Sequence, residues 1–227
     1  MKHVAKGASP VSFENWKGKA NADWEPTYPD LQNPEKQDIQ VALLTEQGWV
    51  CCYCGRSVSL SDSHIEHFRP QNGGYSELQL NYENLLASCL RELKPGLPLH
   101  CGHAKTDNFD EAKQISPLEP TCEQRFIYTQ LGEILPADQS DVRAAYMMSL
   151  LALDTPFLRD ARAAVVSKVL NVDFLNTAST EELQQLRDAF RRRDNEGKLP
   201  DFGHAVARYA EQWLGGTENA PPEPPAV

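Results

Sequence analysis

Apolar residues at helical spacing mark the first predicted element. Within residues 35–47, Ile39, Ala42 and Leu43 recur at intervals that place them on one face of a helix, and Gly48 stands where such a helix would end. The pattern therefore predicts a helix that leads directly into a cysteine-rich stretch.

Two later stretches alternate as strands do. In residues 63–70, His64 and Glu66 alternate with Ile65 and His67, and a proline ends the run. That pattern predicts a short strand. Further along, two short apolar runs flank a Leu-Gly turn, which predicts a β-hairpin made of residues 125–130 and 133–135.

Helical patterns dominate from Gln139 onward. Pro156 follows Asp-Thr at a helix start, and Ser179 with Glu182 has the spacing of a capping box. The predicted helices cover 141–153, 156–170, the stretch after Ser179, and 200–214. The sequence therefore predicts an α+β protein with a mainly helical C-terminal half.

Composition divides the chain into four regions. The first 34 residues are rich in Pro and Trp, which favours an extended arm, and the last 13 are rich in Pro, which favours disorder. The predicted regions are an arm over 1–34, a central domain over 35–136, a helical region over 137–214 that would dock a partner, and a disordered tail over 215–227.

The totals are those of an ordinary globular protein, with 41% hydrophobic and 24% charged residues. No apolar run approaches the roughly 20 residues that a membrane-spanning helix needs, and no secretory signal precedes the first helix. We therefore expect a cytoplasmic protein without a membrane partner. Because cytoplasmic thiols are reduced, its six cysteines favour metal binding over disulfides.

The net charge of −10 complicates any role on nucleic acid. Proteins that grip nucleic acid alone usually present a basic surface. None of the stretches 1–50, 51–113 and 114–227 has more basic than acidic residues. A nucleic-acid enzyme of this composition would rely on a local patch or on a partner, and we expect the partner.

Cys51 and Cys54 form a C-x-x-C pair on a predicted tight turn, and Gly55 permits the bend. Two thiolates at this spacing are half of a tetrahedral zinc site. Cys52 lies between them and is predicted to point elsewhere. Taken alone, the pair is equally compatible with a redox pair or with chance.

Cys89 and Cys101 can supply the second half of that site, although an inserted loop separates them. With all four thiolates available, a structural Zn²⁺ held by Cys51, Cys54, Cys89 and Cys101 becomes the favoured interpretation. The cysteines would then hold the surrounding loops and take no part in the chemistry.

Glu66, His67 and Asn84 lie between the two cysteine pairs. Phosphodiester hydrolysis needs a base that activates water and a divalent metal on the phosphate. His67 can be the base, Glu66 can bind a hard ion such as Mg²⁺ or Mn²⁺, and Asn84 can orient the base. Individually, a Glu-His surface pair and a helix-capping Asn are the simpler explanations. Their position between the zinc cysteines favours catalysis.

This set of motifs resembles the HNH endonuclease family in its zinc-bound ββα-metal form. C-x-x-C, E-H-F-R-P, N-L-L-x-x-C and C-x-x-x-K carry the resemblance over about residues 49–113. It implies that His67 is the general base, that Glu66 binds the catalytic metal and that Asn84 is the family's asparagine. The family's last His would stand at Gly102, so the resemblance transfers the second metal ligand to His103.

Four further residues belong to the predicted site. Asp107 and Asp110 are fallback metal ligands on a helix predicted over 104–113. Arg69 and Lys105 are predicted to contact the substrate phosphate.

A wider set of segments resembles the HNH subunits of Septu anti-phage systems, the PtuB group, including retron-associated forms. I-E-H-F-R-P, H-C-G-H-A-K and I-S-P-L-E-P-x-C-E-x-R-F-I-Y carry it. The resemblance implies an effector nuclease acting on DNA or RNA with an ABC/SMC-like, PtuA-like ATPase. In retron forms, a reverse transcriptase with its RNA and DNA would join the complex.

Two other functions stay open at this point. A non-catalytic zinc adaptor that binds a partner or nucleic acid is favoured by the glycine at position 102. A redox protein using Cys51 and Cys54 is a weaker alternative. The metal-dependent nuclease is the preferred hypothesis, because an adaptor has no need of Glu66, His67 and Asn84 in this order.

Overall fold

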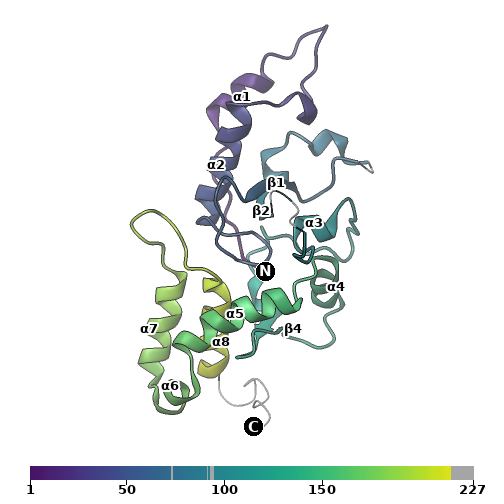
Figure 1. Ribbon diagram of the computed structural model, residues 1–227. Coiled ribbons are helices and arrows are strands. Elements are labelled where there is room, and N and C mark those ends of the chain that lie inside the picture. Colours follow the sequence, from purple (N-terminus) through teal and green to yellow (C-terminus); the bar gives the residue numbers. More distant parts are fainter. Residues whose placement is uncertain (73, 91, 93–94, 216–227) are drawn as a thin grey trace.

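The computed structural model describes residues 1–72, 74–90, 92 and 95–215. Helices and two small antiparallel sheets share one chain, so the α+β class is confirmed (Figure 1). The N-terminal helices lie at one end of the molecule, the C-terminal helices lie at the other, and the first sheet lies between them.

The N-terminal segment is more ordered than an extended arm. It forms helix α1 (Val11–Lys17) and the 3₁₀ turn η1 (Tyr28–Asp30) before helix α2 (Glu35–Gln47), whose predicted bounds are confirmed. Phe13 and Trp16 of α1 are buried, so burial of two aromatic side chains stabilises a helix that no side-chain cap supports.

The central unit has the order strand, strand, helix. Strand β1 (Ser63–His67) pairs antiparallel with β2 (Leu85–Cys89), and the short helix α3 (Gly102–Lys105) follows. Two 3₁₀ turns, η2 (Ser76–Leu78) and η3 (Tyr82–Asn84), connect the strands. This is the predicted ββα arrangement, with four cysteines gathered beside its sheet.

The predicted helix over 104–113 is wrong. Helix α3 ends at Lys105 because Thr106 adopts φ +52°, a left-handed conformation that interrupts a helix. Asp110 then opens a turn, accepting hydrogen bonds at its backbone carbonyl from Lys113 and Gln114.

The second half begins with the predicted hairpin and continues as helices. Polar side chains cap most of the helix starts: Thr155 accepts from the Leu158 N–H, and Ser179 and Glu182 form the predicted capping box. The elements are η4 (Glu123–Arg125), β3 (Phe126–Tyr128), β4 (Ile134–Pro136), α4 (Val142–Leu150), α5 (Pro156–Val169), α6 (Val172–Thr177), α7 (Thr180–Arg191) and α8 (Gly203–Leu214).

Helix α8 joins the helical half to the rest of the molecule. The Gln212 side chain exchanges hydrogen bonds with both backbone groups of Tyr128, and Phe202 N–H donates to the carbonyl of Gly55. His204 of the same helix is buried and hydrogen-bonded to the Tyr128 hydroxyl at 3.0 Å, so its role in this structure is packing.

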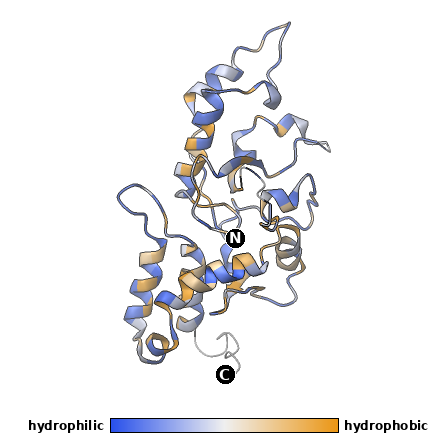
Figure 2. Ribbon diagram, viewed as in Figure 1, coloured by the Kyte–Doolittle hydropathy of each residue, from blue (hydrophilic) through white to orange (hydrophobic). Residues whose placement is uncertain are grey.

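Apolar side chains form two adjoining clusters, and helix α8 contributes to both. The larger cluster runs from α1 and α2 through the first sheet to α5, and the smaller one joins α5 to α8. In Figure 2 apolar colouring accordingly appears on α2 and on α4, α5 and β4, while the loops beyond α1 are mainly hydrophilic. Of the predicted disordered tail over 215–227, residues 216–227 lie outside the described residues.

The β3–β4 turn provides a test of this packing. Gly132 has φ +75°, and a Cβ there would lie 2.0 Å from the Arg159 carbonyl oxygen and 2.7 Å from the Ala163 nitrogen, both in the backbone of α5. We expect Gly132→Ala to lower the free energy of unfolding by about 2–4 kcal/mol, because strain and overpacking add. Urea denaturation measures the change.

Gly197 is the matched control. Its φ is +76°, and no atom lies within 4 Å of the added Cβ, so Gly197→Ala introduces backbone strain alone. A loss of about 1 kcal/mol is expected. Equal losses in the two variants would contradict close packing of the turn on α5.

Candidate functional site

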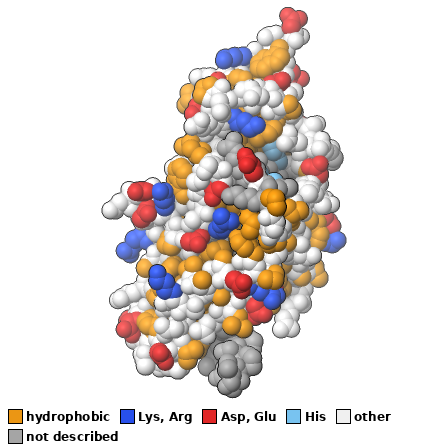
Figure 3. Space-filling view, viewed as in Figure 1, with side chains coloured by type: hydrophobic (Ala, Val, Ile, Leu, Met, Phe, Trp, Pro, Cys, Tyr) orange, Lys and Arg blue, Asp and Glu red, His pale blue; other side chains and the backbone are white. Residues whose placement is uncertain are grey.

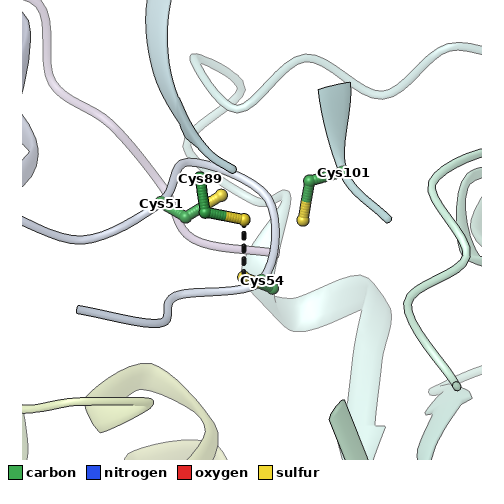
Figure 4. A group of neighbouring side chains, drawn as sticks. All are labelled: Cys51, Cys54, Cys89 and Cys101. Carbon is green, nitrogen blue, oxygen red and sulfur yellow. Dashed lines mark hydrogen bonds between the residues drawn. The ribbon is translucent and has the colours of Figure 1, made fainter. Parts of the chain in front are cut away.

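Four buried cysteines meet beside the first sheet (Figure 4). The sulfur atoms of Cys51, Cys54, Cys89 and Cys101 all lie within 4.8 Å of one another, and those of Cys54 and Cys89 are 3.8 Å apart. Cys51 and Cys54 come from the turn ahead of β1, Cys89 ends β2, and Cys101 precedes α3. One cluster therefore fastens all three parts of the ββα unit.

The chemistry of the cluster suits a thiophilic metal ion such as zinc. Burial alone would raise the pKa of the Cys51 thiol, but hydrogen bonds from the neighbouring thiols lower it well below its ordinary value. Burial also raises the pKa of Cys101. An ion that binds thiolates would satisfy all four sulfur atoms at once.

Two neighbours of the cluster have different roles. Cys52 is buried but outside the group of four, as predicted. His100, which sequence reasoning missed, places Nδ1 3.2 Å from the sulfur of Cys101 and 3.5 Å from that of Cys89, with its ring stacked on Phe157. Its position directly before one of the four clustered cysteines was the available signal.

Glu66 lies on the face of β1 that meets α3. Its Oε1 accepts hydrogen bonds from the Tyr53 hydroxyl and the Lys105 ammonium, each at 3.0 Å. Its Oε2 lies 3.5 Å from Nε2 of His64. Burial would raise the pKa of the carboxyl, but the approach of the His64 ring and the Lys105 charge lower it, so Glu66 is ionised at neutral pH.

Lys105 has an internal role in this structure. Its side chain is buried, and besides Glu66 the ammonium donates to the carbonyl oxygens of His67 at 2.9 Å and Thr106 at 3.3 Å. Its predicted contact with substrate stays a prediction, and it would require the ammonium to leave these partners.

His67 lies on the opposite side of the strand, because consecutive strand residues face opposite ways. Its Nε2 lies 3.0 Å from the Gln79 carbonyl, which can only accept, so Nε2 carries the proton. Nδ1 then bears the lone pair and accepts from the Gln71 amide at 3.3 Å. The rings of Tyr28 and His67 pack edge to face, with their centroids 4.5 Å apart. Burial lowers the pKa of His67, which keeps the imidazole neutral near pH 7.

Asn84 acts on the backbone next to His67 and not on its ring. The side-chain oxygen accepts from the Arg69 N–H at 2.8 Å, and the amide donates to the carbonyls of Arg69 at 2.9 Å and Leu78 at 3.2 Å. In place of the predicted direct contact with the base, Asn84 makes hydrogen bonds that hold together the backbone after His67 and the backbone before Gln79.

His103 lies beside the Glu66 face, with its ring centroid 4.8 Å from that of His64. Its Nε2 hydrogen-bonds the carbonyl oxygen of Leu90, which also bonds Nδ1 of His64 at 3.2 Å. His64, absent from the predicted site, thus lies between Glu66 and His103. Because residues 64 and 66 share one face of a strand, alternation was the signal for including it.

The remaining predicted residues lie outside the group formed by Glu66, His64 and Lys105. Arg69 pairs with Glu111 at 3.1 Å and is partly exposed. Asp107 accepts from Asn72, and Asp110 pairs with Lys113 at 2.9 Å, so the two fallback ligands are engaged outside the Glu66 group. Arg69 and Asn84 also line a cavity of about 320 Å³.

The surface has the mixed charge that the composition implies. On the face shown in Figure 3, basic and acidic side chains are scattered among one another. None of the helices in the described part of the chain is long and apolar enough to cross a membrane.

Comparison with known proteins gives one informative match. No family model matches the chain. The chain is 25% identical over 173 residues to a curated protein of Vibrio cholerae serotype O1 biovar El Tor, named "Retron Vc95 putative HNH endonuclease". The match covers 72% of this chain and 82% of that protein. The relative carries the family name that the motifs predict.

Neighbouring cysteines test the metal cluster. We expect Cys54→Ala to lose the bound metal and to unfold at lower temperature, because three thiolates hold the ion less tightly than four. Metal content per chain, measured by elemental analysis, and thermal unfolding report the change. Cys52→Ala is the control, since that thiol is equally buried but outside the cluster. Full metal content in Cys54→Ala would contradict the assignment.

Proposed function

We infer that this chain belongs to the HNH endonuclease family, and we propose that it is a metal-dependent nuclease that hydrolyses phosphodiester bonds in DNA or RNA. The family follows from the motifs, the ββα unit and the retron relative.

The observation that carries the proposal is the setting of His67. A neutral imidazole with Nε2–H fixed on a backbone carbonyl presents Nδ1 as a base. The Gln71 amide that occupies Nδ1 is a single side-chain contact, which a water molecule can replace. We propose that Nδ1 takes the proton of the water that attacks phosphorus.

Glu66 is the proposed ligand for a divalent ion, Mg²⁺ or Mn²⁺, on the face next to α3. Its Oε1 is used by Tyr53 and Lys105, whereas Oε2 faces His64 and the backbone of Gly102. When bound, such an ion supplies charge stabilisation at the phosphate. In the proposal His103 remains a second candidate ligand.

Zn²⁺ is the proposed occupant of the cysteine cluster, with a structural role. Four thiolates and no open position are typical of structural zinc, while catalytic zinc keeps a site for water. The cluster positions β2 and α3, and through them Glu66 and its partners.

Asn84 is a positioning residue in this proposal, and Arg69 is the proposed phosphate contact. The Arg69 guanidinium is held by an exposed ion pair with Glu111, which contributes little and is readily exchanged for a phosphate. The cavity beside it would take part of the nucleic acid.

We also propose that the nuclease is the effector of a bacterial anti-phage complex with an ABC/SMC-like ATPase. The net charge of −10 and the mixed surface support a partner that presents the substrate. The name of the relative adds a retron context, in which a reverse transcriptase and its nucleic acid would take part. The C-terminal helical region is the proposed docking site.

His67→Ala tests the catalytic assignment. Removing a general base is expected to lower the cleavage rate by about 10²–10⁴-fold. The assay uses Mg²⁺ or Mn²⁺ with the ATPase present, on DNA and on RNA, and a phage-protection assay accompanies it. His3→Ala, which changes a histidine outside the ββα unit, is the control. Equal cleavage and protection by His67→Ala and the wild type would instead favour the zinc adaptor.

Exposed apolar residues test the docking site. Val142 and Val172 are 71% and 50% exposed on α4 and α6, and Val11 on α1 is 74% exposed. We expect Val142→Asp with Val172→Asp to weaken co-purification with the ATPase by about tenfold or more, about 1.4 kcal/mol, and Val11→Asp to leave it unchanged. The reverse result would move docking to the N-terminal arm. Deleting helix α8 is unsuitable, because it is part of the core.

A further inference from the structure

The close approach of two side chains explains why position 102 is a glycine. A Cβ built there would lie 2.4 Å from Oε2 of Glu66 and 2.8 Å from Nε2 of His64. Contacts this short are excluded, so no residue with a side chain fits while Glu66 and His64 keep their places. The side chain that approaches Oε2 of Glu66 therefore comes from strand β1, as His64, and not from helix α3.

His64 is oriented as a metal-ligating histidine is. Its Nδ1 lies 3.2 Å from the Leu90 carbonyl oxygen, which fixes the tautomer with the proton on Nδ1. Nε2 then carries the lone pair and points at Oε2 of Glu66, 3.5 Å away. The Leu90 carbonyl also engages Nε2 of His103, so that nitrogen carries a proton and offers no lone pair.

Two lone-pair atoms at this separation repel each other unless a cation lies between them. A ligand bond of about 2.0–2.2 Å on each side is compatible with two atoms 3.5 Å apart on one divalent ion. Lys105 does not supply that charge to Oε2, because its ammonium bonds Oε1. The side chain of His64 is 23% exposed, so an ion can reach the pair from solvent.

Building on the proposed nuclease function, we propose that His64 and Glu66 together bind the catalytic divalent ion, with His64 replacing the histidine that position 102 lacks. His103 then positions the Leu90 carbonyl, so the ligand role that the family resemblance transfers to His103 passes to His64. The pair of ligands comes from one strand, two residues apart, on the face opposite His67.

The test is Mn²⁺ binding by the zinc-loaded full-length protein without nucleic acid, followed by calorimetry or by electron paramagnetic resonance. His64→Ala is expected to weaken Mn²⁺ binding by at least about tenfold, since even outer-shell changes cost that much. His103→Ala should retain binding within about threefold, and His67→Ala, on the same strand but the other face, should retain it fully. Zinc content reports that each variant is folded.

Gly102→Ala is the second variant, because its methyl group displaces both proposed ligands while leaving the cysteines in place. It should lose Mn²⁺ binding and keep zinc. Unchanged Mn²⁺ affinity in His64→Ala would overturn the inference. The positive charge between His64 and Glu66 would then be a proton on His64. Loss in His103→Ala alone would also overturn the inference. Neither result touches the proposed nuclease function, which fails separately if His67→Ala cleaves as well as the wild type.

Discussion

The packing of Cys101 against three other buried cysteines is the constraint on which the candidate site depends. Helix α3 has only four residues, far too few to be stable by itself, and no side chain caps it. Its position is fixed because Cys101 precedes it and belongs to the cluster. Gly102 and Lys105, which contact Glu66, are thereby held at the surface of β1.

Because side chains alternate along strand β1, the candidate site residues lie on two opposite faces of the strand. His64 and Glu66 face α3, while His67 faces Tyr28, Gln71 and Gln79. Each face has its own electrostatic balance: Lys105 and Tyr53 stabilise a carboxylate on one, and burial keeps an imidazole neutral on the other. A metal ligand and a base can thus adjoin in sequence without forming an ion pair that would inactivate both.

The sequence predicted the parts that depend on side-chain type and spacing. Helix α2, the β3–β4 hairpin, the capping box at Ser179 and the four cysteines all followed from local patterns. The end of α3 was missed because nothing in the residue type of Thr106 announces its left-handed conformation. Helix α1 was missed because tertiary burial of Phe13 and Trp16 supports it, with no cap of its own.

The contacts that set the chemistry were also beyond the sequence. His67 and His64 are oriented by the carbonyls of Gln79 and Leu90, and every residue has a carbonyl, so composition and spacing cannot identify the acceptor. Asn84 was found by its place in the motif, but its backbone clamp on Arg69 required the fold.

The contact between helix α8 and Gly55 gives the two ends of the molecule a mechanical connection. Phe202 donates to the Gly55 carbonyl, and the His204 ring fills the space where Gly55 lacks a side chain. Gly55 directly follows Cys54, so helix α8 packs within one residue of a clustered cysteine. The C-terminal helices and the cysteine turn therefore cannot be repositioned independently of each other.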